Sequence, residues 1–84
     1  MNRTDTAAAI RAALHEVAPE ADLDQLGPAT DIRESLELDS LDFLRFVELL
    51  SERTGHRIDE DDYPQLTTTS QACEFLAGTA GRPR

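Results

Sequence analysis

Apolar residues recur near the start of the chain with the spacing of an amphipathic helix. Ile10, Leu14 and Val17 stand at positions i, i+4 and i+7, so they share one side of a helix. We predict a first helix over residues 5–17, in which the alanines favour helical backbone and either Thr4 or Asp5 is the N-cap.

Residues 18–39 form a connection that is too long for an ordinary turn. Gly27 and Pro28 mark a break within it. The apolar residues scattered along it are Leu23, Leu26, Ile32, Leu36 and Leu38. Connections longer than about 12–15 residues are uncommon in compact domains and are often functional. We therefore expect this one to pack over the core, with a short helical turn at residues 22–26.

The clearest element is a second helix over residues 40–54. Asp39 suits its N-cap, Asp42 lies close to the position of a capping-box partner, and Gly55 is a natural C-terminal stop. Its apolar stripe consists of Leu41, Leu44, Val47 and Leu50, widened by Phe43, Phe46 and Leu49. A helix this apolar is expected to be buried on more than one side, with Leu41 directed to the core to fix the preceding turn.

Two shorter helices are predicted in the last third of the chain. The acidic run at residues 59–62 suits a first helical turn, which indicates a short third helix over residues 60–66. A fourth helix is predicted over residues 70–77, capped by Thr69 and ended by Gly78.

These elements predict an all-α fold, a small four-helix bundle with a long first connection and a short third helix. The length fits one domain, residues 1–84. Its ordered core is expected at about residues 5–78, with disorder at residues 1–3 and 79–84.

Charge and composition narrow the class of protein. The 84 residues include 17 acidic and 8 basic side chains, a formal net charge of -9. Nucleic acid and anionic membrane surfaces are therefore poor partners, whereas basic protein surfaces are favoured. The single cysteine excludes an internal disulfide and, with only two histidines, an ordinary zinc site, so no metal centre is predicted. We find neither a signal peptide nor a membrane span in the pattern and expect a cytoplasmic protein.

Ser40 stands at the first position of the 40–54 helix, directly after the long connection. The first N–H groups of a helix have no partner within it, so a phosphate attached here would meet the positive end of the helix dipole, worth roughly 0.3–1 kcal/mol. The position thus suits a serine that carries an anionic phosphodiester. An Asp-Ser pair is also an everyday capping signature, and alone it does not separate the two interpretations.

Several segments between Leu36 and Leu76 stand in a characteristic order. They are LELDSLD at residues 36–42, the apolar helix at 43–50, Gly55, Ile58 with the acidic run 59–62, LTT at 66–68, and the apolar turn of Ala72, Phe75 and Leu76. With this spacing the sequence resembles the acyl carrier protein family, the phosphopantetheine-binding carriers. The first helix fits that family by pattern alone.

The resemblance implies a carrier and not an enzyme. A separate phosphopantetheinyl transferase would attach 4′-phosphopantetheine from coenzyme A to the hydroxyl of Ser40. The thiol of this arm would hold acyl intermediates as thioesters, which partner enzymes load, modify and unload. Asp39 matches the family residue that helps to recruit the magnesium used by the transferase.

The same resemblance suggests contact and cargo residues. Leu41 and Asp42 match positions that partner enzymes touch, and Arg45 and Glu48 on the same helix are further candidates. An acyl pocket between helices would be lined by Phe43, Phe46, Leu50 and Leu76, although an ordinary core also explains their periodicity.

Two departures from the family pattern bear on the pathway. Arg45 and Arg53 interrupt the acidic residues of the second helix, and Glu37 and Leu38 stand where the turn before Asp39 often contains a glycine. We therefore expect a dedicated carrier in a specialised lipid, polyketide or related pathway, acting as a monomer. The alternatives are an aminoacyl or peptidyl carrier, which differs in cargo, and an unmodified acidic helical module that binds a basic partner.

Overall fold

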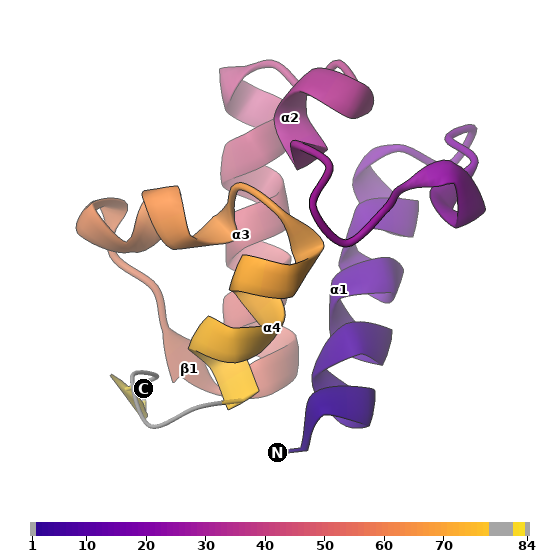
Figure 1. The fold of residues 1–84 in the computed structure, drawn as a ribbon. Coiled ribbons are helices and arrows are strands. Elements are labelled where there is room, and N and C mark those ends of the chain that lie inside the picture. Colours follow the sequence, from indigo (N-terminus) through magenta and orange to yellow (C-terminus); the bar gives the residue numbers. More distant parts are fainter. Residues whose placement is uncertain (1, 78–81, 84) are drawn as a thin grey trace.

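The computed structural model describes residues 2–77 and 82–83, which form a small helical fold with one two-residue strand pair (Figure 1). In chain order the elements are α1 (Arg3–Val17), the 3₁₀ helix η1 (Leu23–Gln25), α2 (Ile32–Ser35), α3 (Ser40–Thr54), β1 (His56–Arg57), the 3₁₀ helix η2 (Glu60–Leu66), α4 (Thr69–Ala77) and β2 (Arg82–Pro83). The all-α bundle with a long first connection is confirmed. No helix in the described ranges is both long and apolar enough to cross a membrane.

Helix α1 packs against both α3 and α4, and the core lies between these three helices (Figure 1). The largest side chains that are fully buried there are Phe46, Ile10, Leu14, Ile32, Leu50, Leu66 and Leu76. The predicted stripe of α1 is thus confirmed for Ile10 and Leu14, while Val17 is half-buried at its edge.

The start of α1 differs from the prediction. The helix begins at Arg3, and its N-cap is Asn2, whose Oδ1 accepts a hydrogen bond from the Asp5 backbone N–H at 2.8 Å. Asparagine is as good a cap as Thr4 or Asp5, so local preference alone did not decide among the three. The expected disorder of residues 1–3 stays a prediction, although Arg3 begins α1, and Met1 lies outside the described residues.

The long connection contains the predicted turn and one further helix. Turn η1 begins after Asp22, as expected, whereas α2 was not predicted because four residues are too few to show a helical period. Two backbone bonds tie this segment to the start of α4: Ile32 N–H donates to the Thr67 carbonyl at 2.8 Å, and Ser70 N–H donates to the Pro28 carbonyl at 3.0 Å. The connection is thus held against the bundle along its length.

Helix α3 has the predicted bounds, but only one of its sides is buried. Its core side consists of Phe43, Phe46, Val47 and Leu50, which stand at i, i+3, i+4 and i+7. Leu41 is 77% exposed and Leu44 is 42% exposed. The expectation that Leu41 points to the core is therefore wrong, because at roughly 100° per residue it lies nearly opposite the core side.

The last two helices have nearly the predicted positions. The third helix spans the expected residues as the 3₁₀ helix η2, in which Asp59 N–H donates to Asp62 Oδ2 at 3.0 Å. Helix α4 begins one residue early, at Thr69, and its cap is Thr68 instead of Thr69: the Gln71 N–H donates to Thr68 Oγ1 at 3.1 Å and the Thr68 N–H to Gln71 Oε1 at 3.2 Å. Gly78, the predicted stop, lies outside the described residues.

The expected disorder at residues 79–84 stays a prediction, although two residues of this segment are placed in a strand. Residues 82–83 form β2, which pairs antiparallel with β1 so that His56 stands opposite Pro83. Residues 79–81 and 84 lie outside the described residues. The strand pair places this end of the chain beside the C-terminal end of α3.

Candidate modification site

Ser40 is exposed at the first position of α3. The preceding Asp39 has extended backbone, and its Oδ1 accepts the Asp42 N–H at 2.8 Å, which confirms Asp39 as the N-cap. Among the described residues, the Asp42 side chain accepts no reciprocal bond from the Asp39 N–H, so the arrangement is a simple cap. The hydroxyl of Ser40 is left free to face solvent at the positive end of a 15-residue helix.

The other serines are less suitable for modification by a large enzyme. Ser51 donates its hydroxyl to the His56 carbonyl at 2.7 Å, and Ser70 is half-buried beside the long connection. Ser35 is exposed like Ser40, but it ends the four-residue helix α2. Ser40 is thus the exposed serine that begins a long helix.

The turn before Ser40 is fixed by Leu38, and not by Leu41 as the sequence suggested. Leu38 is buried in the core, and its N–H donates to the Arg33 carbonyl at 2.9 Å. Glu37 has φ +53°, the left-handed conformation that glycine adopts most readily. In the turn where the resembling family often has a glycine, Glu37 thus adopts the left-handed backbone conformation that suits glycine, although it has a side chain.

The Asp39 carboxylate retains an oxygen for other partners. Oδ1 forms the cap, and no hydrogen bond or ion pair is found for Oδ2 on this exposed side chain. Within residues 2–77 and 82–83, no group of three or more His, Cys, Asp or Glu side chains is placed to hold a metal ion. A cation at Asp39 would therefore need ligands from another molecule.

The candidate partner contacts lie on the outer side of α3. Leu41, Arg45 and Glu48 are exposed, and Asp42 is half-buried. Leu44 adds a second exposed apolar side chain, which the sequence had assigned to the core. This outer side combines apolar, basic and acidic groups within two turns of Ser40.

The four predicted pocket residues are all in the core. Phe43, Phe46, Leu50 and Leu76 are at most 5% exposed. Of these four residues, Phe43 alone also borders a cleft formed by described residues. The acyl pocket therefore stays a prediction.

The cleft beside Phe43 has a volume of about 250 Å³. Tyr63 packs edge-on against the Phe43 ring with centroids 5.4 Å apart, and the Arg33 guanidinium carbon lies 4.9 Å from the centroid of that ring. Neither Arg33 nor Tyr63 was predicted as a site residue from the sequence. Their positions in α2 and η2 show no pattern of their own, and the fold brings them to α3.

A comparison with protein families gives a match over residues 8–76 to a family described as the phosphopantetheine attachment site. The chain belongs to this family. The match contains α1 from Ala8 onward, which the sequence resemblance reached only by pattern, and it includes Ser40 and the residues of the cleft beside Phe43. A comparison with curated proteins found no significant match.

Membership confirms the carrier interpretation. The family's domains are non-catalytic carriers with a covalently attached 4′-phosphopantetheine, so this chain is a carrier and not an enzyme. A phosphopantetheinyl transferase and enzymes that handle the cargo are its partner classes.

Proposed function

We propose that Ser40 carries the 4′-phosphopantetheine arm and that the protein is an acyl carrier of a specialised lipid, polyketide or related pathway. The observation that carries the proposal is the exposed hydroxyl at the first position of α3, inside the matched span. The free N-terminal end of α3 favours the negative charge that the attached phosphodiester brings.

The attachment is a phosphoryl transfer from coenzyme A. The Ser40 oxygen bonds to the phosphorus that bears pantetheine, the bond from that phosphorus to the 3′,5′-bisphosphate nucleotide breaks, and the hydroxyl proton goes to a base of the transferase. Asp39 Oδ1 is used by the N-cap, so its other carboxylate oxygen, Oδ2, would bind the magnesium of that enzyme. Asp39 directly precedes Ser40, whose hydroxyl is the attacking group.

The mixed charges on the outer side of α3 are an argument for partner enzymes that are specific to this carrier. Arg45 has no ion pair with another described residue and stands between Asp42 and Glu48, so a partner with a uniformly basic surface would face one repulsive charge. The exposed Leu41 and Leu44 offer apolar contacts in the same area. The proposal takes the protein as a monomer that exposes this side to successive partners.

The test is intact-protein mass spectrometry after incubation with coenzyme A, magnesium and a broad-specificity phosphopantetheinyl transferase. We expect one phosphopantetheine addition to the wild type and to Ser35→Ala, in which the other exposed serine is removed, and none to Ser40→Ala. Addition to Ser40→Ala would place the arm elsewhere. A folded wild type that several transferases leave unmodified would favour the unmodified interaction module.

Two substitutions separate the roles of Asp39. Asp39→Asn keeps a cap oxygen and should leave the free energy of unfolding within about 0.5 kcal/mol, whereas Asp39→Ala should cost about 0.5–2 kcal/mol. Both should lower the initial rate of arm attachment at limiting magnesium. An Asp39→Asn variant modified at the wild-type rate would show that Asp39 is only a cap.

A further inference from the structure

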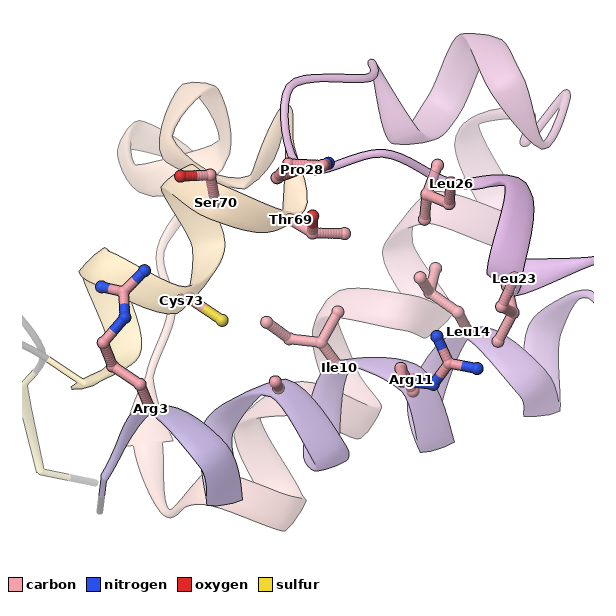
Figure 2. Close-up of a pocket in the computed structure, with 11 residues that line it drawn as sticks. Arg3, Ile10, Arg11, Leu14, Leu23, Leu26, Pro28, Thr69, Ser70 and Cys73 are labelled. Carbon is pink, nitrogen blue, oxygen red and sulfur yellow. The ribbon is translucent and has the colours of Figure 1, made fainter.

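An apolar cavity, partly open to solvent, lies between α1 and the start of α4 (Figure 2), and Ser40 is not among the residues that line it. Its volume is about 260 Å³, and its apolar walls are Ala7, Ile10, Leu14, Leu23, Leu26 and Pro28. A dry cavity of about 150 Å³ with apolar walls is large enough to bind benzene. This cavity therefore accommodates an apolar group larger than one aromatic ring.

The two ends of the cavity differ in charge. Near Leu14 and Leu23, the Arg11 guanidinium forms an ion pair with Asp24 at 2.9 Å, so that end is neutralised (Figure 2). At the other end Arg3 lies beside Cys73 (Figure 2), and Arg3 has no ion pair with any described residue. The cavity thus runs from an ion-paired arginine to an unpaired one.

Cys73 lines the cavity at the same end as Arg3. Its side chain is buried, and Figure 2 shows the sulfur directed between α4 and α1. Burial raises the pKa of this thiol, and the positive charge of Arg3 acts in the opposite direction. An anion at the same end would be stabilised by the same charge.

We propose that this cavity binds a single-chain carboxylate, with its apolar chain between α1 and the 23–28 segment and its carboxylate on Arg3. Filling the cavity restores the van der Waals contacts that its walls lack, and the head group pairs the free guanidinium. Arg3 favours an anionic head group even though the protein as a whole is acidic. The nearby positive charge acts more strongly on the ligand than distant negative charges, which salt screens. No residue of the Ser40 site lines the cavity, so this inference goes beyond the proposed function.

Decanoate is the probe, and ¹H–¹⁵N NMR titration of the full chain is the measurement. The titration uses Ser40→Ala, which lacks the proposed attachment serine, and runs below the micelle concentration of decanoate. We expect saturable shifts centred on Ala7, Ile10 and Cys73. Decanol, which has the chain without the charge, should bind about two- to fivefold more weakly.

Matched variants test the role of Arg3. Arg3→Gln should weaken decanoate binding about two- to fivefold, as expected for an exposed arginine, and leave decanol binding unchanged. Arg57→Gln, at an exposed arginine that does not line the cavity, should bind decanoate like its parent. Ala7→Leu should fill the cavity and abolish the shifts, with its fold checked by circular dichroism. Shifts that do not saturate, or that lie outside the cavity, would overturn the proposal, as would equal decanoate binding by Arg3→Gln.

A second readout uses the single cysteine of the chain. In Ser40→Ala, saturating decanoate should slow labelling of Cys73 by a thiol reagent several-fold, and decanoate at the same concentration should have no such effect on Ala7→Leu. Unchanged labelling of the parent would also overturn the proposal. Neither result depends on whether Ser40 accepts the arm.

Discussion

Glu37 is the residue at which sequence preference and fold conflict most directly. It is the one non-glycine residue of the described ranges with a positive φ, and it stands two residues before the cap of α3. A left-handed conformation costs a residue with a Cβ roughly 1–2 kcal/mol. The buried side chain of Leu38 and its bond to the Arg33 carbonyl hold the turn in spite of this cost.

We predict that Glu37→Gly raises the free energy of unfolding, by up to about 1 kcal/mol, because the relief of left-handed strain exceeds the added flexibility of the unfolded chain. Glu37→Ala keeps the Cβ and should change stability by no more than about 0.5 kcal/mol. Urea unfolding at constant pH measures both. A Glu37→Gly variant less stable than Glu37→Ala would show that the added flexibility of the unfolded chain outweighs the relief of left-handed strain.

Helix α3 has one side in the core and one side exposed to solvent, and its sequence alone does not distinguish them. Leucines occur on both sides, yet Leu50 is fully buried and Leu41 is 77% exposed. The buried side contains Phe43 and Phe46, whose ring centroids are 6.1 Å apart in the core. The outer side therefore exposes single apolar side chains. Their exposure costs little free energy in the unbound protein, and partners can contact them.

Matched leucine substitutions in α3 test this division. Leu50→Ala should cost about 2–5 kcal/mol in the free energy of unfolding, because it leaves a cavity in the core. Leu41→Ala should change it by at most about 0.5 kcal/mol while slowing arm attachment by the transferase. Urea unfolding and the mass-spectrometric rate provide the two readouts. A Leu41→Ala loss comparable to that of Leu50→Ala would contradict the exposed placement of Leu41.

The whole molecule is small relative to its charge. It carries a formal net charge of -9 and extends over 31 × 24 × 19 Å. At 0.01 M salt the screening length is about 30 Å, so charges repel one another across the full width of the molecule, whereas at 0.15 M it is about 8 Å. The three ion pairs found among the described residues are exposed, and each contributes roughly 0–1 kcal/mol.

We therefore predict that the melting temperature rises between 0.01 M and 0.15 M sodium chloride. Screening weakens both the net repulsion and the exposed ion pairs, and the repulsion is the larger effect because acidic residues outnumber basic ones by about two to one. Thermal unfolding followed by circular dichroism measures the shift. A melting temperature that falls over this range would show that the ion pairs outweigh the repulsion.

The sequence by itself determined four of the helices, the bounds of α3 and the carrier family. Helical periodicity, the cap at Asp39 and the left-handed stop at Gly55 are local properties that neighbouring residues specify. The place of Ser40 at the start of a long helix is visible in the chain in the same way, and the resemblance to the carrier family singled it out as the attachment serine. The bounds of η2 followed in the same way from its acidic start, although its 3₁₀ geometry did not.

Only the tertiary structure decided which apolar residues face outward and where the cavity lies. Leu41 and Leu50 are identical in type, and their burial depends on how α1 and α4 pack against α3. Helix α2, the Arg33 and Phe43 contact, and the Arg3 end of the cavity depend on segments that are far apart in the chain. Local preference cannot specify such contacts, because their free energy exists only after the helices have packed together.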